Sequence, residues 1–172
     1  MSEELAKVKK ICTEMCLQRN YTNINDNDDY MSSKDDGNVV LIFFIIDNKL
    51  NIDESHNIIT TMINNNSKHA IIVHFKGLTP VSNKVLSDMY DYEFELFEHK
   101  ELMYNITKHV LVPSHQVLTF ENNEEEKIFK EKFRKICTIQ KSDPVAKFYN
   151  FKKGDIIEIK RQGGYIAYRL VR

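Results

Sequence analysis

Asp91, Glu98 and Lys100 have side chains of the types that hydrolyse phosphodiesters with a metal ion. In such a site two carboxylates hold magnesium and a lysine assists the attacking water. Glu98 and Lys100 also fall at the expected end of a strand, where charged residues are usual. A magnesium-dependent nuclease is therefore one hypothesis for this chain, with solvated surface charge as its alternative.

Histidine and cysteine pairs are the other residues that could bind a metal. His109 and His115 lie six residues apart around a Leu-Val-Pro segment, and Cys12 and Cys16 lie four apart in an expected helix. Neither pair has a second pair of ligands at the spacing of a zinc site. We therefore expect no metal and no cofactor, and two cysteines buried on a helix face.

Composition is that of a globular chain with a charge difference between its two parts. Of 172 residues, 42% are apolar and 28% are charged, and the three cysteines suit a reducing compartment better than a disulfide framework. The longest apolar run, residues 39–46, is far shorter than the roughly 20 residues that span a bilayer, and the N-terminus does not resemble a secretory signal. Residues 109–172 carry 13 basic and 8 acidic residues (+5), whereas residues 1–108 carry 11 and 17 (−6). A basic C-terminal part fits an acidic protein, phosphate or an inert solvated surface.

The first hundred residues predict a small α/β domain. Leu5, Val8, Cys12 and Met15 recur at helical spacing, residues 39–46 are apolar without alternation, and residues 92–98 alternate as in a strand with one wet face. Asp53 and Thr79 are expected to cap helices. The expected elements are a helix at 3–19, a polar loop at 20–38, strands at 39–46, 69–75 and 92–98, and helices at 53–63 and 79–89. Alternating strands and helices favour a partly parallel sheet.

The remaining residues predict a second, smaller α+β domain after a boundary near residues 105–113. A charged helix is expected at 121–135, with Ile128, Phe129 and Phe133 inward. Asp143 followed by Pro144 is typical of a helix start, and Gly154 of a turn. Strands at 155–161 and 165–171 are expected to form a hairpin through Gln162-Gly163-Gly164.

The residues after Asn105 carry a resemblance to a known family. The matching pieces are Asn105-Ile106-Thr107, His109, Leu111-Val112-Pro113, His115, Leu118-Thr119, Ser142-Asp143-Pro144-Val145-Ala146, Lys153-Gly154-Asp155, Ile159, Arg161 and Tyr168-Arg169-Leu170-Val171. In order and spacing they resemble the fifth subunit shared by eukaryotic RNA polymerases I, II and III, a family that includes a smaller archaeal counterpart. Upstream, Ala70-Ile71-Ile72-Val73 and Leu78-Thr79-Pro80 resemble the N-terminal domain of the eukaryotic form, which the archaeal counterpart lacks.

Three positions depart from the family pattern. Residues 136–139 read Ile-Cys-Thr-Ile where the family has Leu-Pro-Arg-Ile, and Asn150 replaces a glycine. The final hairpin loop is cut to Gln162-Gly163-Gly164, which removes part of a surface. The short length and the usage of Asn, Ile and Lys favour a compact, viral or otherwise divergent member.

The resemblance implies a non-catalytic polymerase subunit of two domains, residues 1–105 and 106–172. The N-terminal jaw domain is expected to have an inactive nuclease-like topology beside downstream duplex DNA. The C-terminal domain is expected to serve polymerase assembly by docking on the largest subunit near the small sixth subunit. Localisation is expected in the nucleus for a cellular polymerase, and in a host cell or virion for a viral one.

The resemblance also assigns residues to these roles. The expected DNA-proximal residues are Thr79, Pro80, Ser82 and Lys84. The expected partner-binding residues are His109, Leu111, Val112, Pro113, His115, Asp143, Pro144, Val145, Ala146, Gly154, Arg161, Tyr168 and Arg169. A structural reading stands beside each: a helix cap for Asp143 and Thr79, and a solvated strand face for Arg161 and Arg169. The chain could also be a free transcription factor that carries the C-terminal module.

Overall fold

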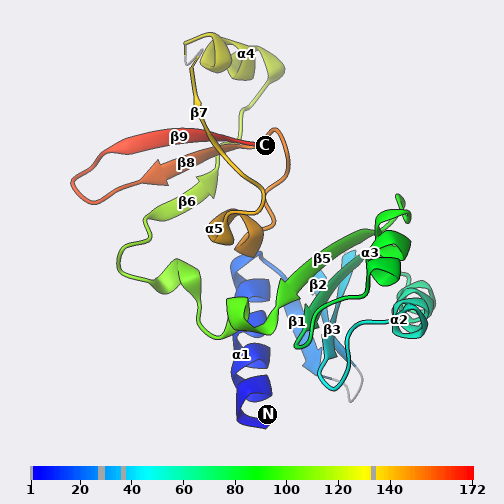
Figure 1. Ribbon diagram of the computed structural model, residues 1–172. Coiled ribbons are helices and arrows are strands. Elements are labelled where there is room, and N and C mark those ends of the chain that lie inside the picture. Colours follow the sequence, from blue (N-terminus) through cyan, green and yellow to red (C-terminus); the bar gives the residue numbers. More distant parts are fainter. Residues whose placement is uncertain (1, 27–29, 36–37, 133–134) are drawn as a thin grey trace. The chain divides into compact units, whose positions relative to one another are not determined.

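The computed structural model describes residues 2–26, 30–35, 38–132 and 135–172 of a mixed α+β chain with two sheets (Figure 1). The chain divides into two compact units between Tyr104 and Asn105, one residue before the boundary expected from the sequence. The units are therefore described separately, each with its own sheet and its own core.

The first unit contains a five-stranded mixed sheet in the order β1-β2-β3-β4-β5. The strands β1, β2 and β3 pair antiparallel, and β3, β4 and β5 pair parallel. The elements are α1 (Ser2–Gln18), β1 (Thr22–Asp26), β2 (Tyr30–Asp35), β3 (Asn38–Ile45), α2 (Ile52–Asn64), β4 (His69–His74), α3 (Pro80–Ser87), β5 (Glu93–Glu98) and the 3-10 helix η1 (His99–Leu102). The parallel half of the sheet is the α/β arrangement that the sequence predicted.

The loop expected at residues 20–38 is wrong in its described part, because β1 and β2 are strands. Asparagine and aspartate have low strand propensity, so the local sequence favours a turn. The strand β2 pairs along its whole length with β3, from Tyr30 opposite Phe43 to Asp35 opposite Asn38. Pairing with an apolar neighbour strand therefore overrides the local preference. Residues 27–29 and 36–37 lie outside the described part of the chain.

Helices cover both faces of this sheet. On one face Leu41 and Ile72 pack with Ile58 and Met62 of α2 and with Leu86 of α3. On the other face lies α1: its Lys9 ammonium stands 5.5 Å from the centre of the Phe44 ring of β3. Figure 1 shows α1 on one side of the sheet, with α2 and α3 on the other. The wet face expected for β5 is therefore wrong, because α1 covers it.

Helix starts and ends follow their local chemistry, with one shift. Asn51, not Asp53, caps α2: its side chain accepts from the Glu54 N–H at 2.8 Å, and the Glu54 carboxylate accepts from the Asn51 N–H at 3.1 Å. This reciprocal pair is a capping box, which satisfies two N–H groups of the first turn. Asp53 lies in that first turn. Thr79 caps α3 with Pro80 at its first position, as the sequence predicted.

The second unit contains a four-stranded sheet in the order β6-β8-β9-β7. Its elements are η2 (Ile106–Lys108), β6 (Ser114–Val117), α4 (Asn123–Lys132), β7 (Cys137–Ile139), α5 (Pro144–Phe148), β8 (Ile156–Lys160) and β9 (Ile166–Val171). The pairs β6–β8 and β8–β9 are antiparallel, and β7 pairs parallel with β9. Its core gathers Ile139, Ala146, Phe151, Ile157, Ile159 and Val171. The hairpin of β8 and β9 and the short helix α5 confirm the sequence prediction.

Two other features of this unit differ from the prediction. The helix α4 is shorter than the expected 121–135, and Ile128 is 60% exposed instead of inward. Phe129 does pack, with its ring centre 4.9 Å from that of Tyr168. Phe133 lies outside the described residues. The strands β6 and β7 were not predicted, because neither sequence has an alternating apolar pattern.

Candidate interaction surfaces

The Asp143-Pro144 pair begins the helix α5. The Asp143 carboxylate accepts from the N–H groups of Val145 at 2.9 Å and Ala146 at 3.4 Å, and Pro144 occupies the first helical position. Val145 and Ala146 are buried within the unit, whereas Pro144 is exposed. The block therefore builds the helix start, and Pro144 is its member that presents a side chain to solvent.

Two left-handed residues end α5 and open the final hairpin. Asn150, at the position where the family has glycine, has φ +53°, and Gly154 has φ +98°. Asparagine tolerates this left-handed conformation better than most other non-glycine residues, so Asn150 can replace the glycine without a change in backbone conformation. The Gly154 N–H donates to the Val171 carbonyl at 3.0 Å. This bond ties the turn to the end of β9.

The hairpin carries the two candidate arginines and Tyr168. The turn is closed by the Arg161 N–H, which donates to the Tyr165 carbonyl at 2.8 Å, with positive φ at Gly163 and Gly164. Arg161 is exposed beside this turn, and Arg169 is half-buried opposite Ile157 of β8. Residues directly opposite on antiparallel strands share a face, so Arg169 lies on the core side of the sheet.

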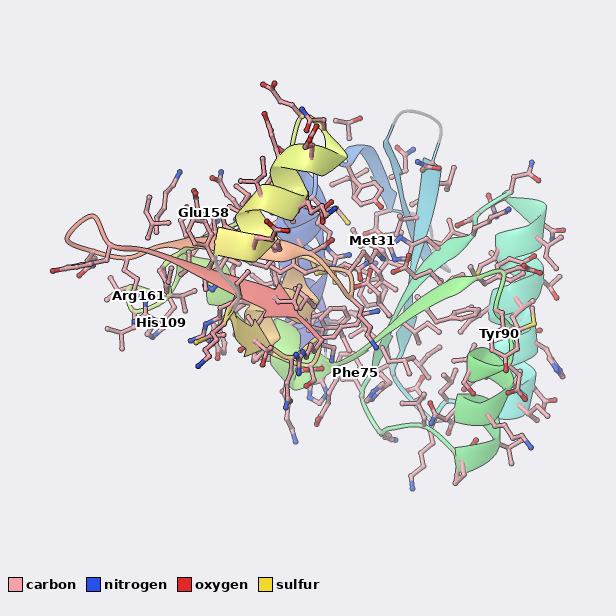
Figure 2. All side chains as sticks on the ribbon, turned by 90° about the horizontal axis from the view of Figure 1, so that it is seen from above. Met31, Phe75, Tyr90, His109, Glu158 and Arg161 are labelled. Carbon is pink, nitrogen blue, oxygen red and sulfur yellow. The ribbon has the colours of Figure 1, made fainter. Side chains whose placement is uncertain are left out.

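An apolar and basic hollow lies at the start of β6. It is lined by Val110, Leu111, Val112, Pro113, Ser114, Lys160, Arg161 and Gln162. Val110 and Leu111 are 80% and 81% exposed, and with Val112 and Pro113 they make the lining of this hollow contiguous apolar surface. Figure 2 shows His109 and Arg161 close to this region. The structure thus brings Leu111, Val112, Pro113 and Arg161 together, and leaves Asp143, Gly154 and Tyr168 elsewhere in the unit.

His109 and His115 shape the backbone of that hollow. The Nδ1 atom of His109 accepts from the Leu111 N–H at 3.2 Å, and the Nδ1 atom of His115 donates to the Pro113 carbonyl at 2.7 Å. Each imidazole ring therefore fixes the backbone at a residue two positions along the chain. Among the described residues no group of three metal-ligating side chains lies close enough to hold an ion.

The helix α3 and its cap hold the expected DNA-proximal residues, with Lys84 in the last turn. The Thr79 hydroxyl accepts from the Ser82 N–H at 3.3 Å, and the fully buried Ser82 hydroxyl donates to the Leu50 carbonyl at 2.8 Å. These hydroxyls serve the helix start. Pro80 and Lys84 are exposed, so Lys84 carries the charge that this surface offers.

The residues of the nuclease hypothesis lie at opposite ends of the strand β5. Asp91 precedes β5 and Glu98 ends it, and six strand residues extend roughly 16 Å at about 3.3 Å per residue. Glu98 pairs with Lys100 at 3.2 Å. These side chains cannot share one magnesium ion, so the hypothesis is wrong on geometry.

A buried charge cluster in the first unit has no counterpart among the residues predicted from the sequence. The two terminal nitrogens of the Arg19 guanidinium donate hydrogen bonds to the two carboxylate oxygens of Glu95, at 2.7 and 2.8 Å. His69 Nε2 donates to the same carboxylate at 2.6 Å. The side chains of Arg19 and Glu95 are only 5% and 8% exposed. Burial favours the neutral carboxyl, but the His69 hydrogen bond and the Arg19 charge outweigh it, so the pKa of Glu95 is lowered.

No local sequence signal distinguishes Glu95 from a solvated strand residue. Arg19 follows the end of α1 and lies 76 residues away, so only the packing of α1 against β5 reveals the pair. Cys12 and Cys16 are buried on the same helix, as expected, and burial raises the pKa of the Cys12 thiol. Among the described helices none is both long and apolar enough to cross a membrane.

Comparison with known proteins gives two kinds of match. The family "RNA polymerase Rpb5, C-terminal domain" matches residues 104–171, which is almost the whole second unit. The chain is also 38% identical over 143 residues to the DNA-directed RNA polymerases I, II, and III subunit RPABC1 of Caenorhabditis briggsae. That alignment covers 80% of this chain and 68% of the nematode protein.

Two further relatives extend this range. The rpabc1 subunit of Dictyostelium discoideum is 32% identical over 154 residues, covering 82% of this chain and 76% of its own. A putative DNA-directed RNA polymerase subunit 454R of Invertebrate iridescent virus 6 is 37% identical over 92 residues, or 45% of this chain and 48% of the viral one. The nematode and amoeba alignments are longer than the 68 residues of the second unit, so each includes part of the first.

Proposed function

Because the chain belongs to the RNA polymerase Rpb5 family and is thus a subunit of a multisubunit DNA-directed RNA polymerase, we propose that it serves transcription without catalysing nucleotide addition. Its partners are other polymerase subunits. The observation that carries the non-catalytic role is the placement of its charged residues. The carboxylates of the nuclease hypothesis stand at opposite ends of β5, and the buried charge of Glu95 is paired with Arg19.

The second unit docks on the largest polymerase subunit, near the small sixth subunit. The exposed side chains of Leu111, Pro144 and Arg161 supply direct contacts. Asp143, Val145, Ala146 and Gly154 act by fixing the backbone that carries those contacts. The charge of +5 over residues 109–172 favours an acidic surface on the partner.

The first unit forms part of the lower jaw beside downstream duplex DNA. It keeps a nuclease-like arrangement of strands and helices without a nuclease site. The exposed surface of α3, with Pro80 at its start and Lys84 in its last turn, is the part nearest to DNA phosphates. The acidic balance of the first 108 residues argues that this contact is weak and formed only within the complex.

The relatives come from cells and from a virus, and the proposal covers both sources. In a cellular polymerase the chain acts in the nucleus. In a viral polymerase it acts in the host cell or is carried in the virion.

Co-purification tests this function. The tagged chain, isolated from its native source, is expected to bring down the largest polymerase subunit in equal amount. Leu111→Asp should lower that recovery about tenfold, because it replaces an apolar contact by a charge that must be desolvated and that repels an acidic partner. Tyr90→Asp is the matched control, since Tyr90 is 90% exposed and belongs to the first unit (Figure 2). Recovery without any polymerase subunit would contradict the proposal, and sub-stoichiometric recovery would favour a free factor.

A further inference from the structure

The strand β6 is an edge of the second sheet, with backbone groups that point away from its neighbour. The sheet order places β8 on one side of β6 and no described strand on the other (Figure 1). Edge strands with free N–H and C=O groups are templates for a strand from another chain. The N–H and C=O groups of β6 that do not bond to β8 are the ones that such a strand would use.

Two hydrogen bonds outside the strands settle the direction of every residue. The Leu118 N–H donates to the Ile156 carbonyl at 2.8 Å, so Leu118, Gln116 and Ser114 bond toward β8. The Arg161 N–H donates to the Tyr165 carbonyl at 2.8 Å, which assigns the odd-numbered residues of β8 to β9. Both assignments agree. The N–H and C=O groups of His115 and Val117 therefore point outward.

The side chains of β6 continue the core toward this edge. His115 lies opposite Ile159 and Val117 opposite Ile157, and both isoleucines are core residues. Val117 is 43% exposed. A strand added beside β6 would cover Val117 with its own side chains and would bury apolar area that is now wet.

The two ends of β6 carry opposite charges. The hollow at its start is lined by Leu111 and Pro113 with the basic Lys160 and Arg161, and its described lining includes no acidic residue. A second hollow at its end is lined by Glu121, Glu126 and Asp155, and among the described residues around it none is basic. An extended chain along β6 would therefore meet positive charge at one end and negative charge at the other.

We propose that an extended segment of a neighbouring polymerase subunit adds as a fifth strand to β6. This inference rests on the proposed function, because it takes the occupant from the assembled polymerase. The segment carries an acidic residue beside an apolar one over Leu111 and Arg161, and a basic residue over Glu121 and Glu126. The four residues of β6 extend about 10 Å from the first Cα to the last, and the two hollows lie beyond the strand ends, so these charges lie about four to six residues apart.

Hydrogen–deuterium exchange with residue-level fragmentation tests this mode of docking. The full chain is measured free and within polymerase that is purified through its tag. The His115 and Val117 amides are expected to exchange at least about tenfold more slowly in the complex. The Gln116 amide is the internal reference, because it already donates to β8.

A variant pair separates backbone from side-chain binding. Val117→Pro removes an outward N–H, and proline is tolerated on edge strands, so binding of polymerase should weaken about tenfold. Val117→Ala keeps the N–H and should bind at least about threefold better than the proline variant. Arg161→Glu should also weaken binding, with a smaller loss at high salt.

The outcomes distinguish the two proposals. Slowed amides together with the proline effect support strand addition. Normal assembly with unchanged exchange at His115 and Val117 overturns strand addition and leaves the docking function intact. Absence of any polymerase in the preparation overturns both.

Discussion

Glu95 shows how a single residue can differ in role from what its strand pattern predicts. In the sequence it is one of the acidic positions of an alternating strand, and in the structure it holds Arg19 and His69 inside the first unit. A buried ion pair gains little over an apolar replacement, but the loss of one partner leaves an uncompensated charge. The pair therefore makes the position of α1 on the sheet sensitive to either residue.

Replacement of Arg19 should destabilise the first unit strongly. Arg19→Ala is expected to lower the free energy of unfolding by about 3–5 kcal/mol, because the Glu95 carboxylate stays buried without its guanidinium. Urea unfolding followed by circular dichroism measures the loss. Lys9→Ala, which breaks the more exposed pair with Asp26, should cost about 1 kcal/mol or less. Equal losses in the two variants would contradict a special role for Arg19.

The same carboxylate predicts how stability depends on pH. Since the folded pKa of Glu95 is lowered, its stabilisation is present above the ordinary pKa of the unfolded chain and is lost as pH falls through the folded pKa. Unfolding free energy of the first unit should therefore decrease below about pH 4.5. Glu95→Gln should flatten this decrease when urea midpoints are compared between about pH 6 and about pH 3. An unchanged slope would show that other groups carry the acid sensitivity.

At the scale of elements, the sequence predicted the features that depend on residues close together in the chain. Thr79 and Asp143 were predicted as caps because their side chains accept hydrogen bonds from nearby N–H groups, and the turns were predicted because glycine adopts positive φ. The strands β1, β2, β6 and β7 were missed because they are short or polar and owe their form to partner strands. Asp53 was chosen as a cap because aspartate is a good one, whereas Asn51 has the matching Glu54 three residues later.

The candidate site divides in the same way. Leu111, Pro113 and Arg161 were named from family resemblance, and the structure explains their proximity by the pairing of β6 with β8. The outward direction of the N–H and C=O groups of His115 and Val117 follows from the register of β6 on β8, which cannot be read from residue types. The Arg19–Glu95 pair was invisible for the same reason, since 76 residues separate its members.

The end of α5 offers a test of the family's glycine position. Asn150 has φ +53°, where glycine has no steric cost and alanine does. Asn150→Gly should leave the second unit equally stable or slightly more stable, and Asn150→Ala should cost about 1 kcal/mol. Thermal unfolding of both variants measures the difference. If alanine were tolerated as well as glycine, the left-handed geometry would not explain the family pattern.

At the scale of the whole molecule, charge separates the two units. The basic second unit suits docking on an acidic partner, and the acidic first unit suits only a local approach to DNA. Around Lys84 the acidic residues of the first unit repel DNA phosphates. We therefore expect Lys84 to contribute to DNA binding only when the assembled polymerase holds the unit beside DNA. Binding by the isolated chain is a poor measure of such a contact, because the net charge of −6 over residues 1–108 repels DNA.

Lys84→Glu should weaken the engagement of downstream DNA within the assembled polymerase. The change reverses one exposed charge in the last turn of α3 and removes no buried side chain, so the unit should stay folded. Crosslinking of downstream DNA to the subunit is expected to fall about two- to fivefold. Lys68→Glu is the matched control, since it makes the same charge change at an exposed residue just before β4, at the opposite end of that strand from the segment that leads to α3. If both variants lowered the yield equally, net charge rather than the α3 surface would be responsible. If Lys84→Glu alone had no effect, DNA would not approach this helix.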